Sequence, residues 1–225
     1  SRMRGAKLCP LILDNIIRHE KRPDSPRANG RKNVFLPKTP VIQIRFFRIS
    51  RRFFYKIRED LDRLALADYM AEVVSYVAGQ NEQKEDVMRL VLNTLHFLSN
   101  GERECSFLKS VFEMRFMTEI GMMPDIVCCP VCMTYTADYM CFDMLSTKLY
   151  CHGCFKGSYD DTQIRISASV VHALRHIVFA DFNRLFNFRM SDENMKKLSI
   201  LTEKYLLIHL GREFKTLEFY KSLGN

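Results

Sequence analysis

The sequence predicts an α+β protein with a basic, strand-rich part over residues 1–56 and an α-helical part over residues 57–225. Two observations lead to this prediction. The spacing of apolar residues changes near residue 57 from the period of a strand to the period of a helix. Six cysteines also lie within residues 128–154, which predicts a metal-binding ribbon inserted between helices at about 126–157.

Length and composition indicate a folded protein without a membrane-spanning segment. Of the 225 residues, 47% are hydrophobic, which is ample material for a core. No apolar run approaches the roughly 18 residues that cross a membrane, and the first residues lack the apolar region of a signal peptide. A secreted disulfide-bonded protein spreads its cysteines along the chain, whereas six of the eight cysteines of this sequence lie in one segment. We therefore expect a protein of the reducing cytoplasm.

The charge is divided unevenly between the two parts. Residues 1–56 hold 15 lysines and arginines against three acids, a net charge of +12, whereas residues 57–225 have a net charge of −4. A concentrated positive field attracts phosphate backbones through counterion release. The sequence thus favours nucleic acid as a partner of the basic part, and the alternative is a solvated basic tail.

Within the basic part, residues 41–49 predict a strand. Isoleucine and phenylalanine alternate there with glutamine and arginine, which is the period of a half-buried strand. Residues 21–32 and 35–40 contain prolines and several basic side chains and predict loops.

Helical periodicity begins at Ile57 and returns repeatedly along the rest of the chain. The predicted helices span residues 57–78, 84–100, 106–120, 166–180, 191–210 and 213–223. Glycines at positions 79, 101, 121 and 211 are expected to end four of them. Ser191 or Asp192 is expected to cap the helix over 191–210.

The cysteine-rich segment contains two Cys-x2-Cys motifs. Cys129 and Cys132 form the first, Cys151 and Cys154 form the second, and 18 residues separate them. Zinc prefers four ligands at tetrahedral corners, and two such motifs supply four thiolates from two tight turns. The spacing is typical of a zinc ribbon, with a hairpin between the motifs. The sequence therefore predicts one structural Zn2+ per chain, held by these four thiolates.

Other interpretations of the segment stay open. Disulfide bonds are one, whereas a thioredoxin-type dithiol fits poorly, because such a motif starts a helix after a strand. Cys128 is an alternative to Cys129 as a ligand, and His152 is an alternative to a cysteine. Cys141 is expected to be a buried apolar residue, and Gly153 is expected to ease the second turn.

The sequence lacks the common catalytic motifs. It has no GxSxG, P-loop, GxGxxG or HExxH pattern. His172 and His176 are four residues apart on a predicted helix, but no acidic third ligand is near, so a packed or exposed face is favoured over a metal site. A catalytic zinc keeps one coordination position open, and four cysteines leave none. We expect that the protein is not an enzyme.

Four strings follow one another along residues 57–225: IREDLDRLALADYMAEVV, FEMRFMTEIGMMPDIVCCPVC, LYCHGC and LTEKYLLIHLGREFKTLEFYKSL. Paired Cys-x2-Cys motifs are common, but this order of helix, motif, motif and closing helices is specific. It resembles the RecO family of bacterial recombinational DNA repair mediators. Residues 1–56 match that family poorly.

The resemblance implies an OB-type barrel over residues 1–56, which we expect to be incomplete or divergent, because one or two strands have no counterpart before Ser1. Such barrels bind single strands with a cationic groove and aromatic platforms. On this basis the expected DNA-contacting residues are Arg2, Arg4, Lys7, Arg31, Lys32, Arg45, Arg48, Arg51 and Arg52. The last four are interleaved with aromatic residues, which suits single-stranded DNA; the alternative places those aromatics in a core.

The resemblance also implies a function and partners. A RecO-like protein would bind single- and double-stranded DNA, anneal complementary strands and, with RecR, help to load RecA onto DNA coated with single-strand DNA-binding protein. The implied partners are DNA, RecR, the acidic tail of single-strand DNA-binding protein, RecF and RecA, in the bacterial cytoplasm at the nucleoid. Two alternatives are another zinc-ribbon protein of transcription or RNA processing, and an enzyme with a structural zinc.

Overall fold

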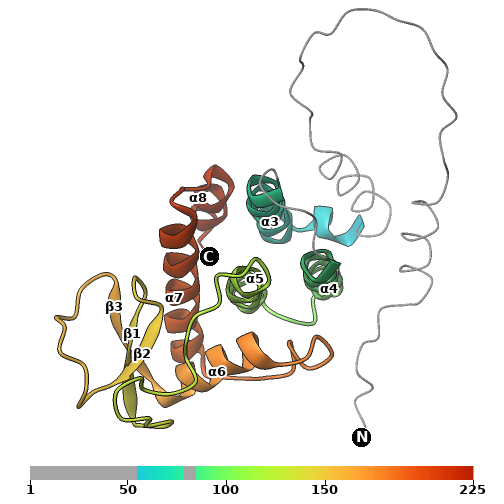
Figure 1. Cartoon of the computed structure of the whole chain (residues 1–225). Helices are drawn as coiled ribbons and strands as arrows, with labels where there is room; N and C mark the ends of the chain where they lie inside the picture. Colours follow the sequence, from blue (N-terminus) through green and yellow to red (C-terminus); the bar gives the residue numbers. More distant parts are fainter. Residues whose placement is uncertain (1–54, 79–84, 225) are drawn as a thin grey trace, which may run out of the picture.

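Six α-helices and a three-stranded sheet form the part of the chain that the structure describes (Figure 1). The structure is a computed structural model, and it describes residues 55–78 and 85–224. Its elements are η1 (Tyr55–Glu59, a 3-10 helix), α3 (Leu61–Ala78), α4 (Glu85–Asn100), α5 (Cys105–Glu119), β1 (Tyr139–Asp143), β2 (Lys148–Cys151), β3 (Gln163–Ser167), α6 (Ala168–Phe179), α7 (Asp192–Leu210) and α8 (Lys215–Ser222). None of these helices has the length and apolarity needed to span a bilayer. The strand predicted at 41–49 and nearly all of the expected barrel lie outside the described residues.

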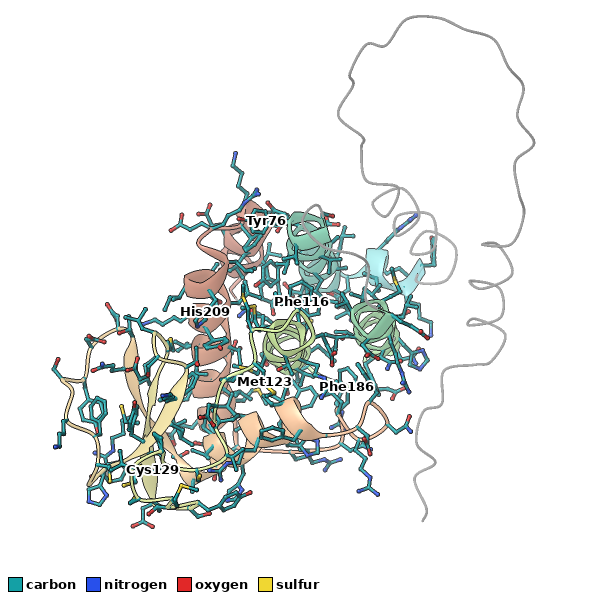
Figure 2. All side chains as sticks on the ribbon, viewed as in Figure 1. Tyr76, Phe116, Met123, Cys129, Phe186 and His209 are labelled. Atoms are coloured by element: carbon teal, nitrogen blue, oxygen red, sulfur yellow. The ribbon has the colours of Figure 1, made fainter. Side chains whose placement is uncertain are left out.

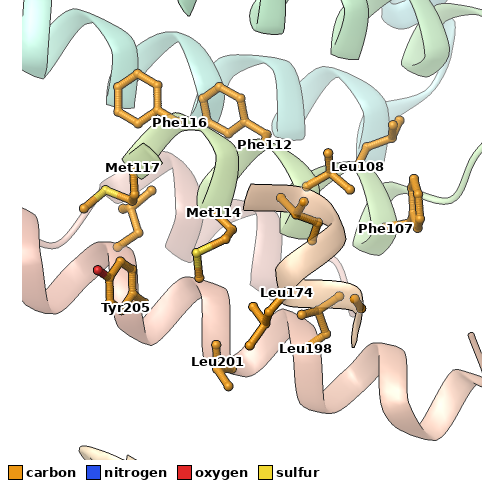
Figure 3. Close-up of a cluster of buried hydrophobic side chains, with 14 of the residues drawn as sticks. Phe107, Leu108, Phe112, Met114, Phe116, Met117, Leu174, Leu198, Leu201 and Tyr205 are labelled. Atoms are coloured by element: carbon orange, nitrogen blue, oxygen red, sulfur yellow. The ribbon is translucent and has the colours of Figure 1, made fainter. Parts of the chain in front are cut away.

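Helix α5 lies at the centre of the helices. It packs against α7, α4, α6 and α3, and Figure 3 shows its side chains beside those of α6 and α7. Bulky apolar side chains fill this core: Phe107, Leu108, Phe112, Met114, Phe116 and Met117 from α5, Leu174 from α6, and Leu198, Leu201 and Tyr205 from α7. A helix that is apolar on most of its sides is expected in the middle of a core.

Helix α5 ends just before Gly121, as the sequence predicts. Gly121 has a φ of 92°, a left-handed conformation that favours glycine. The N–H of Met122 donates to the carbonyl of Met117 at 2.8 Å, and the N–H of Gly121 donates to the carbonyl of Thr118 at 3.1 Å, which is the Schellman pattern. This turn leads the chain from the helical core to the first cysteine motif.

Helix α3 begins at Leu61 rather than at the predicted Ile57, because Asp60 caps it. The Asp60 carboxylate accepts hydrogen bonds from the N–H groups of Asp62 and Arg63, at 3.0 and 3.2 Å. These two donors would otherwise lack an acceptor within the helix. The residues before Asp60 therefore form a separate 3-10 helix.

Replacing Asp60 by alanine is expected to lower the free energy of unfolding by about 1 kcal/mol, because the two N–H groups lose their acceptor. Asp60→Asn is the matched control, since it keeps a capping oxygen and is expected to change stability by only a few tenths of a kcal/mol. Urea denaturation measures both. Equal losses in the two variants would show that the charge of Asp60, and not its capping bond, stabilises this end.

Helices α3 and α8, the first and last α-helices of the described region, pack together (Figure 1). The ring of Phe214 makes edge-on contacts with those of Tyr69 and Tyr76, with centroids 6.1 and 5.9 Å apart. The Glu72 carboxylate accepts hydrogen bonds from the N–H and the hydroxyl of Thr216, at 3.2 and 2.6 Å. The start of α8 is thus attached to the middle of α3.

The sheet is antiparallel, in the order β2-β1-β3. The side chains of one face are buried: Met140, Phe142, Leu149, Cys151 and Ile166. The sequence pattern does not predict strand β3 (Gln163–Ser167), because it places Ile166 and Ser167 in the following helix. Helix α6 therefore begins at Ala168, two residues later than predicted.

The buried face of the sheet packs on α7, which lies beside it in Figure 1. The ring centroid of Phe142 is 5.7 Å from that of Tyr205. The Tyr205 hydroxyl donates to the carbonyl of Met122 at 3.0 Å, and His209 Nε2 is 2.9 Å from the carbonyl oxygen of Met144. Helix α7 therefore holds both the chain before the first cysteine motif and the turn between β1 and β2.

A buried ionic network joins α5 to α3 and α7. Lys109 and Glu113, one turn apart on α5, are 2% and 0% exposed. Lys109 Nζ is 3.1 Å from Glu113 Oε1 and 2.7 Å from Glu203 Oε2. The hydroxyls of Tyr69 and Thr202 each donate to Glu113 at 2.8 Å. Burial raises the pKa of Glu113, although Lys109 and the two hydroxyls oppose that shift.

The other predicted helix ends agree closely with the structure. Helices α4 and α7 end immediately before Gly101 and Gly211, whose φ angles are 65° and 61°. Helix α3 ends at residue 78, and Gly79 lies outside the described residues. Ser191 occupies the N-cap position of α7, but its hydroxyl accepts a hydrogen bond from the Asn194 side chain at 3.0 Å instead of capping the helix.

Candidate metal centre

Four cysteine sulfurs gather beside the sheet. Cys129, Cys132, Cys151 and Cys154 place their Sγ atoms within 4.8 Å of one another, and the Sγ atoms of Cys132 and Cys151 are 3.4 Å apart. Cys129 is fully buried, whereas Cys132 is open to solvent. Figure 2 labels Cys129 at one end of the sheet. The structure thus brings together the four residues that the sequence proposes as ligands.

The first motif forms a turn that closes on itself. The N–H of Met133 donates to the carbonyl of Cys129, and the N–H of Cys129 donates to the carbonyl of Thr134, both at 2.9 Å. Met133 has a φ of 61°, which is uncommon for a residue other than glycine. The Thr134 hydroxyl is 3.1 Å from the sulfur of Cys132. These bonds fix the backbone that carries both sulfurs.

The second motif begins at the last residue of β2. The N–H groups of Cys154 and Phe155 both donate to the carbonyl of Cys151, at 3.1 and 3.0 Å. The expected role of Gly153 in easing this turn was wrong. Gly153 is not in the left-handed conformation, and a Cβ atom there would meet nothing within 4 Å. Neither the backbone nor the available space requires glycine at this position.

The thiols differ in acidity because their hydrogen-bond partners differ. Hydrogen bonds from the hydroxyl and the backbone of Thr134 lower the pKa of Cys132 to about 6. Hydrogen bonding with Cys132 and Cys151 raises the pKa of Cys154 to about 12. These contacts therefore favour a thiolate at Cys132 and a protonated thiol at Cys154. A metal ion binds to deprotonated thiols, so its binding would release the protons that remain on these cysteines.

The donor set fits zinc. At a Zn–S distance of about 2.3 Å, a tetrahedron places its sulfurs about 3.8 Å apart, and these four sulfurs lie within 4.8 Å of one another. Thiolates are soft ligands that suit zinc, copper(I) and iron–sulfur clusters. Four protein ligands fill a tetrahedral shell and leave no position for water. The arrangement suits a structural metal ion better than a catalytic one.

Among the described residues, the group with metal-binding geometry includes neither Cys128 nor His152. The Cys128 sulfur is 3.8 Å from the sulfur of Met133. The His152 ring lies against Tyr139, with centroids 5.2 Å apart. Cys141 is fully buried, as expected, and burial raises the pKa of its thiol to about 12.

The two histidines of α6 do not share a metal-binding arrangement with other described residues. His176 Nε2 is 2.9 Å from the carbonyl oxygen of Arg184, and its ring contacts Phe188, whereas His172 is exposed.

The expected DNA-contacting residues lie outside the described part of the chain: Arg2, Arg4, Lys7, Arg31, Lys32, Arg45, Arg48, Arg51 and Arg52.

Comparison with known proteins relates this architecture to a family. The family model for the C-terminal part of recombination protein O matches residues 58–218, which run from η1 into α8 and include the four cysteines. The chain belongs to the RecO family. The resemblance predicted for the helical part is therefore confirmed.

Several RecO relatives align with most of the chain. A protein of Acetivibrio thermocellus named DNA repair protein RecO is 31% identical over 170 residues, which cover 76% of this chain and 67% of that protein. A protein of the same name from Alkaliphilus metalliredigens is 25% identical over 174 residues, covering 77% and 70%. Another, from Desulfatibacillum aliphaticivorans, is 28% identical over 200 residues, covering 87% and 74%.

Three residues around the cysteines were not predicted: Thr134, Tyr135 and Arg175. Thr134 contacts the sulfur of Cys132. Arg175 is buried on α6 and donates hydrogen bonds to backbone carbonyls on both sides of the first motif. Arginines are mostly exposed. Arg175 nevertheless stands four residues after Val171 and three before Val178, so the helical spacing places it beside the apolar face of α6. That spacing and the polar character of Thr134, two residues after a ligand, were the available signals, and both are weak.

Proposed function

We propose that this protein is a DNA repair mediator of the RecO type without enzymatic activity. It would bind single- and double-stranded DNA, anneal complementary strands and, with RecR, help to load RecA onto single strands coated with single-strand DNA-binding protein. The observation that supports this proposal is the family match over residues 58–218. Relatives that are 31% and 25% identical bear the name DNA repair protein RecO.

In this proposal the four cysteines hold one structural Zn2+ per chain. When bound, the ion would supply four metal–thiolate bonds between the two motifs. Cys129 and Cys132 follow α5, Cys151 is the last residue of β2 and Cys154 lies just after it, so these bonds would fix the loop after α5 to the sheet. The closed set of ligands supports a role in folding, not in chemistry.

The proposed DNA contacts come from the basic part of the chain. Residues 1–56 have a net charge of +12 and would attract the phosphate backbone without reading sequence. RecR, the acidic tail of single-strand DNA-binding protein, RecF and RecA are the proposed protein partners. The proposed location is the bacterial cytoplasm, at the nucleoid.

The test is annealing of complementary strands coated with single-strand DNA-binding protein, with the zinc-loaded whole chain, across a salt series. We expect faster annealing that weakens as salt rises, because phosphate contacts release counterions. No acceleration by folded, zinc-loaded protein would contradict the proposal. A preference for RNA would favour a zinc-ribbon protein of transcription or RNA processing, and turnover of a nucleic acid would favour an enzyme.

A charge-matched pair of variants locates the DNA site within the same experiment. Replacing Arg45, Arg48 and Arg51 by serine is expected to lower the slope of log affinity against log salt by about 2 for single strands, at about 0.7 per lost contact. The control replaces three exposed lysines of the helical part: Lys156, Lys196 and Lys215. Equal changes in the two triple variants would move the DNA site away from the basic part.

A further inference from the structure

We infer that Arg175 is a positioning residue of the cysteine site, which holds the first motif in place and offsets the negative charge of the metal-loaded site. This inference rests on the proposed metal binding. It assigns a role in that binding to a side chain of α6, a helix that carries none of the four cysteine ligands.

Arg175 joins the two ends of the first motif. Its Nε donates to the carbonyl of Ile126 at 2.8 Å, and its Nη2 donates to the carbonyl of Tyr135 at 2.7 Å. Ile126 lies three residues before Cys129, and Tyr135 lies three residues after Cys132. One rigid, planar group therefore sets the distance between the chain entering the motif and the chain leaving it.

The guanidinium is also packed. Its central carbon lies 3.9 Å from the centroid of the Tyr135 ring, in a cation–π contact. Only 6% of the residue is exposed, and Nη1 has no hydrogen-bond partner among the described residues. These contacts hold the Arg175 side chain in one orientation on α6, so the first motif is attached to the helical core and not only to the sheet.

Charge supplies the second part of the argument. The partners that the structure gives to Arg175 are two neutral carbonyls and an aromatic ring, and no ion pair joins it to a carboxylate of the described residues. A buried cation without an opposite charge is unfavourable. Four thiolates and one divalent cation together have a net charge of −2. The loaded site and Arg175 would therefore stabilise each other, and this coupling is reciprocal.

Two substitutions separate geometry from charge. Arg175→Lys keeps the positive charge but loses the planar fork that reaches both carbonyls. Arg175→Met loses both and keeps much of the apolar volume. Residues that orient metal ligands typically change metal affinity about 10- to 100-fold when they are replaced. We expect a loss of that size for Arg175→Met and a smaller loss for Arg175→Lys.

Arg115 provides the control for loss of a partly buried arginine that contacts carbonyls and a ring. Its Nη1 donates to the carbonyls of Ile177, Val178 and Ala180 at 3.1, 3.0 and 2.9 Å, at the C-terminal end of α6. Its central carbon lies 4.7 Å from the ring centroid of Phe182. Arg115→Met therefore removes carbonyl and ring contacts like those of Arg175 without touching the cysteine motifs. It also removes an ion pair, in which Arg115 Nε is 2.6 Å from Glu119 Oε1. Arg165→Met is a second control, since it removes an exposed arginine that lies over Tyr139 in the same sheet.

The measurement is Co2+ and Zn2+ affinity of the whole folded chain by competition with a chelator, together with the thiolate-to-cobalt absorption bands. Arg175→Met is expected to bind metal more weakly and to shift those bands. Arg115→Met is expected to lower the free energy of unfolding while the affinity of the folded protein stays within about threefold, because it leaves the motif untouched. Wild-type affinity and bands in folded Arg175→Met would overturn the inference.

A second measurement covers the case in which Arg175→Met does not fold. In the wild-type chain, hydrogen exchange of the Arg175 Nε–H and of the amides over 126–135 is followed before and after chelation of zinc. We expect exchange to accelerate in both on chelation. An Nε–H that stays equally protected would overturn the coupling. Failure of the wild-type chain to bind Zn2+ would instead overturn the proposed metal site itself.

Discussion

Replacing Cys129 and Cys132 together by serine is expected to abolish zinc binding and to unfold the cysteine-rich segment. Only Cys151 and Cys154 of the four gathered sulfurs would remain, and two thiolates cannot close a tetrahedral shell. Structural zinc contributes about 10–16 kcal/mol of apparent binding free energy in small zinc peptides. Domains as a whole are stable by only about 5–15 kcal/mol. Losing even a modest fraction of the zinc binding free energy is therefore enough to unfold the segment.

The double substitution is also expected to destabilise the helices, because two of the cysteines belong to the same hydrophobic core as the helices. Cys129 and Cys151 belong to the same buried cluster as Met140, Phe142 and Tyr205. A loss of about 3 kcal/mol would lower Tm by roughly 6–12 °C in a domain of this size. Thermal unfolding followed by circular dichroism measures the shift, and elemental analysis measures the bound zinc.

Cys128→Ser is the matched control for this experiment. Cys128 neighbours a ligand, yet its sulfur contacts that of Met133 and lies outside the group of four. We expect a change within about 0.5 kcal/mol. A double variant of Cys129 and Cys132 that is folded, free of zinc and as stable as the wild type would refute the structural site. Counting thiols in the denatured wild type tests the disulfide alternative, and all eight cysteines are expected to react.

Replacing Lys109 by methionine is expected to lower the free energy of unfolding by about 3–5 kcal/mol, because removal of one partner leaves a buried charge uncompensated. Lys109 is the cation that contacts both Glu113 and Glu203. Glu113 would stay buried, with hydrogen bonds from two hydroxyls but without its cation. Urea denaturation at neutral pH measures the loss.

Two further variants show whether the loss comes from the buried charge. Lys197→Met removes an exposed pair of the same spacing, in which Lys197 Nζ is 2.7 Å from Glu193 Oε1, and is expected to cost at most about 0.5 kcal/mol. The double variant Lys109→Met with Glu113→Gln replaces the buried carboxylate that lost its cation by a neutral amide, and it is expected to restore part of the stability. Equal losses for Lys109→Met and Lys197→Met would show that burial of this network contributes nothing.

The helices and the four cysteines could be predicted because each depends on local spacing. Glycines 101, 121 and 211 end helices in left-handed conformations that other residues rarely adopt, so their positions alone indicate the ends. The two Cys-x2-Cys motifs likewise predict two turns from local spacing. The fold was needed only to show that these two turns lie close together. The family resemblance of residues 57–225 rests on the same local strings.

The sequence failed where distant contacts decide the outcome. Residues 163–167 alternate like a strand, but they are short and run directly into a helix, and only pairing with β1 settles their structure. Asp60 reads as one more acid in a helical first turn until its carboxylate is seen to cap α3. Arg175 becomes informative only once α6 lies against the first motif, since its two acceptors are 49 and 40 residues away in the chain.

During synthesis, α3 leaves the ribosome long before the helix that covers it. Glu72 and Thr216, which join these helices, are 144 residues apart. At about 5–20 residues per second, the face of α3 that includes Tyr69 and Tyr76 would wait roughly 7–30 s for α8. In that interval the nascent chain offers an apolar helix face to chaperones. A polypeptide that stopped after α7 would lack Phe214 and α8, so this face of α3 would stay without its cover.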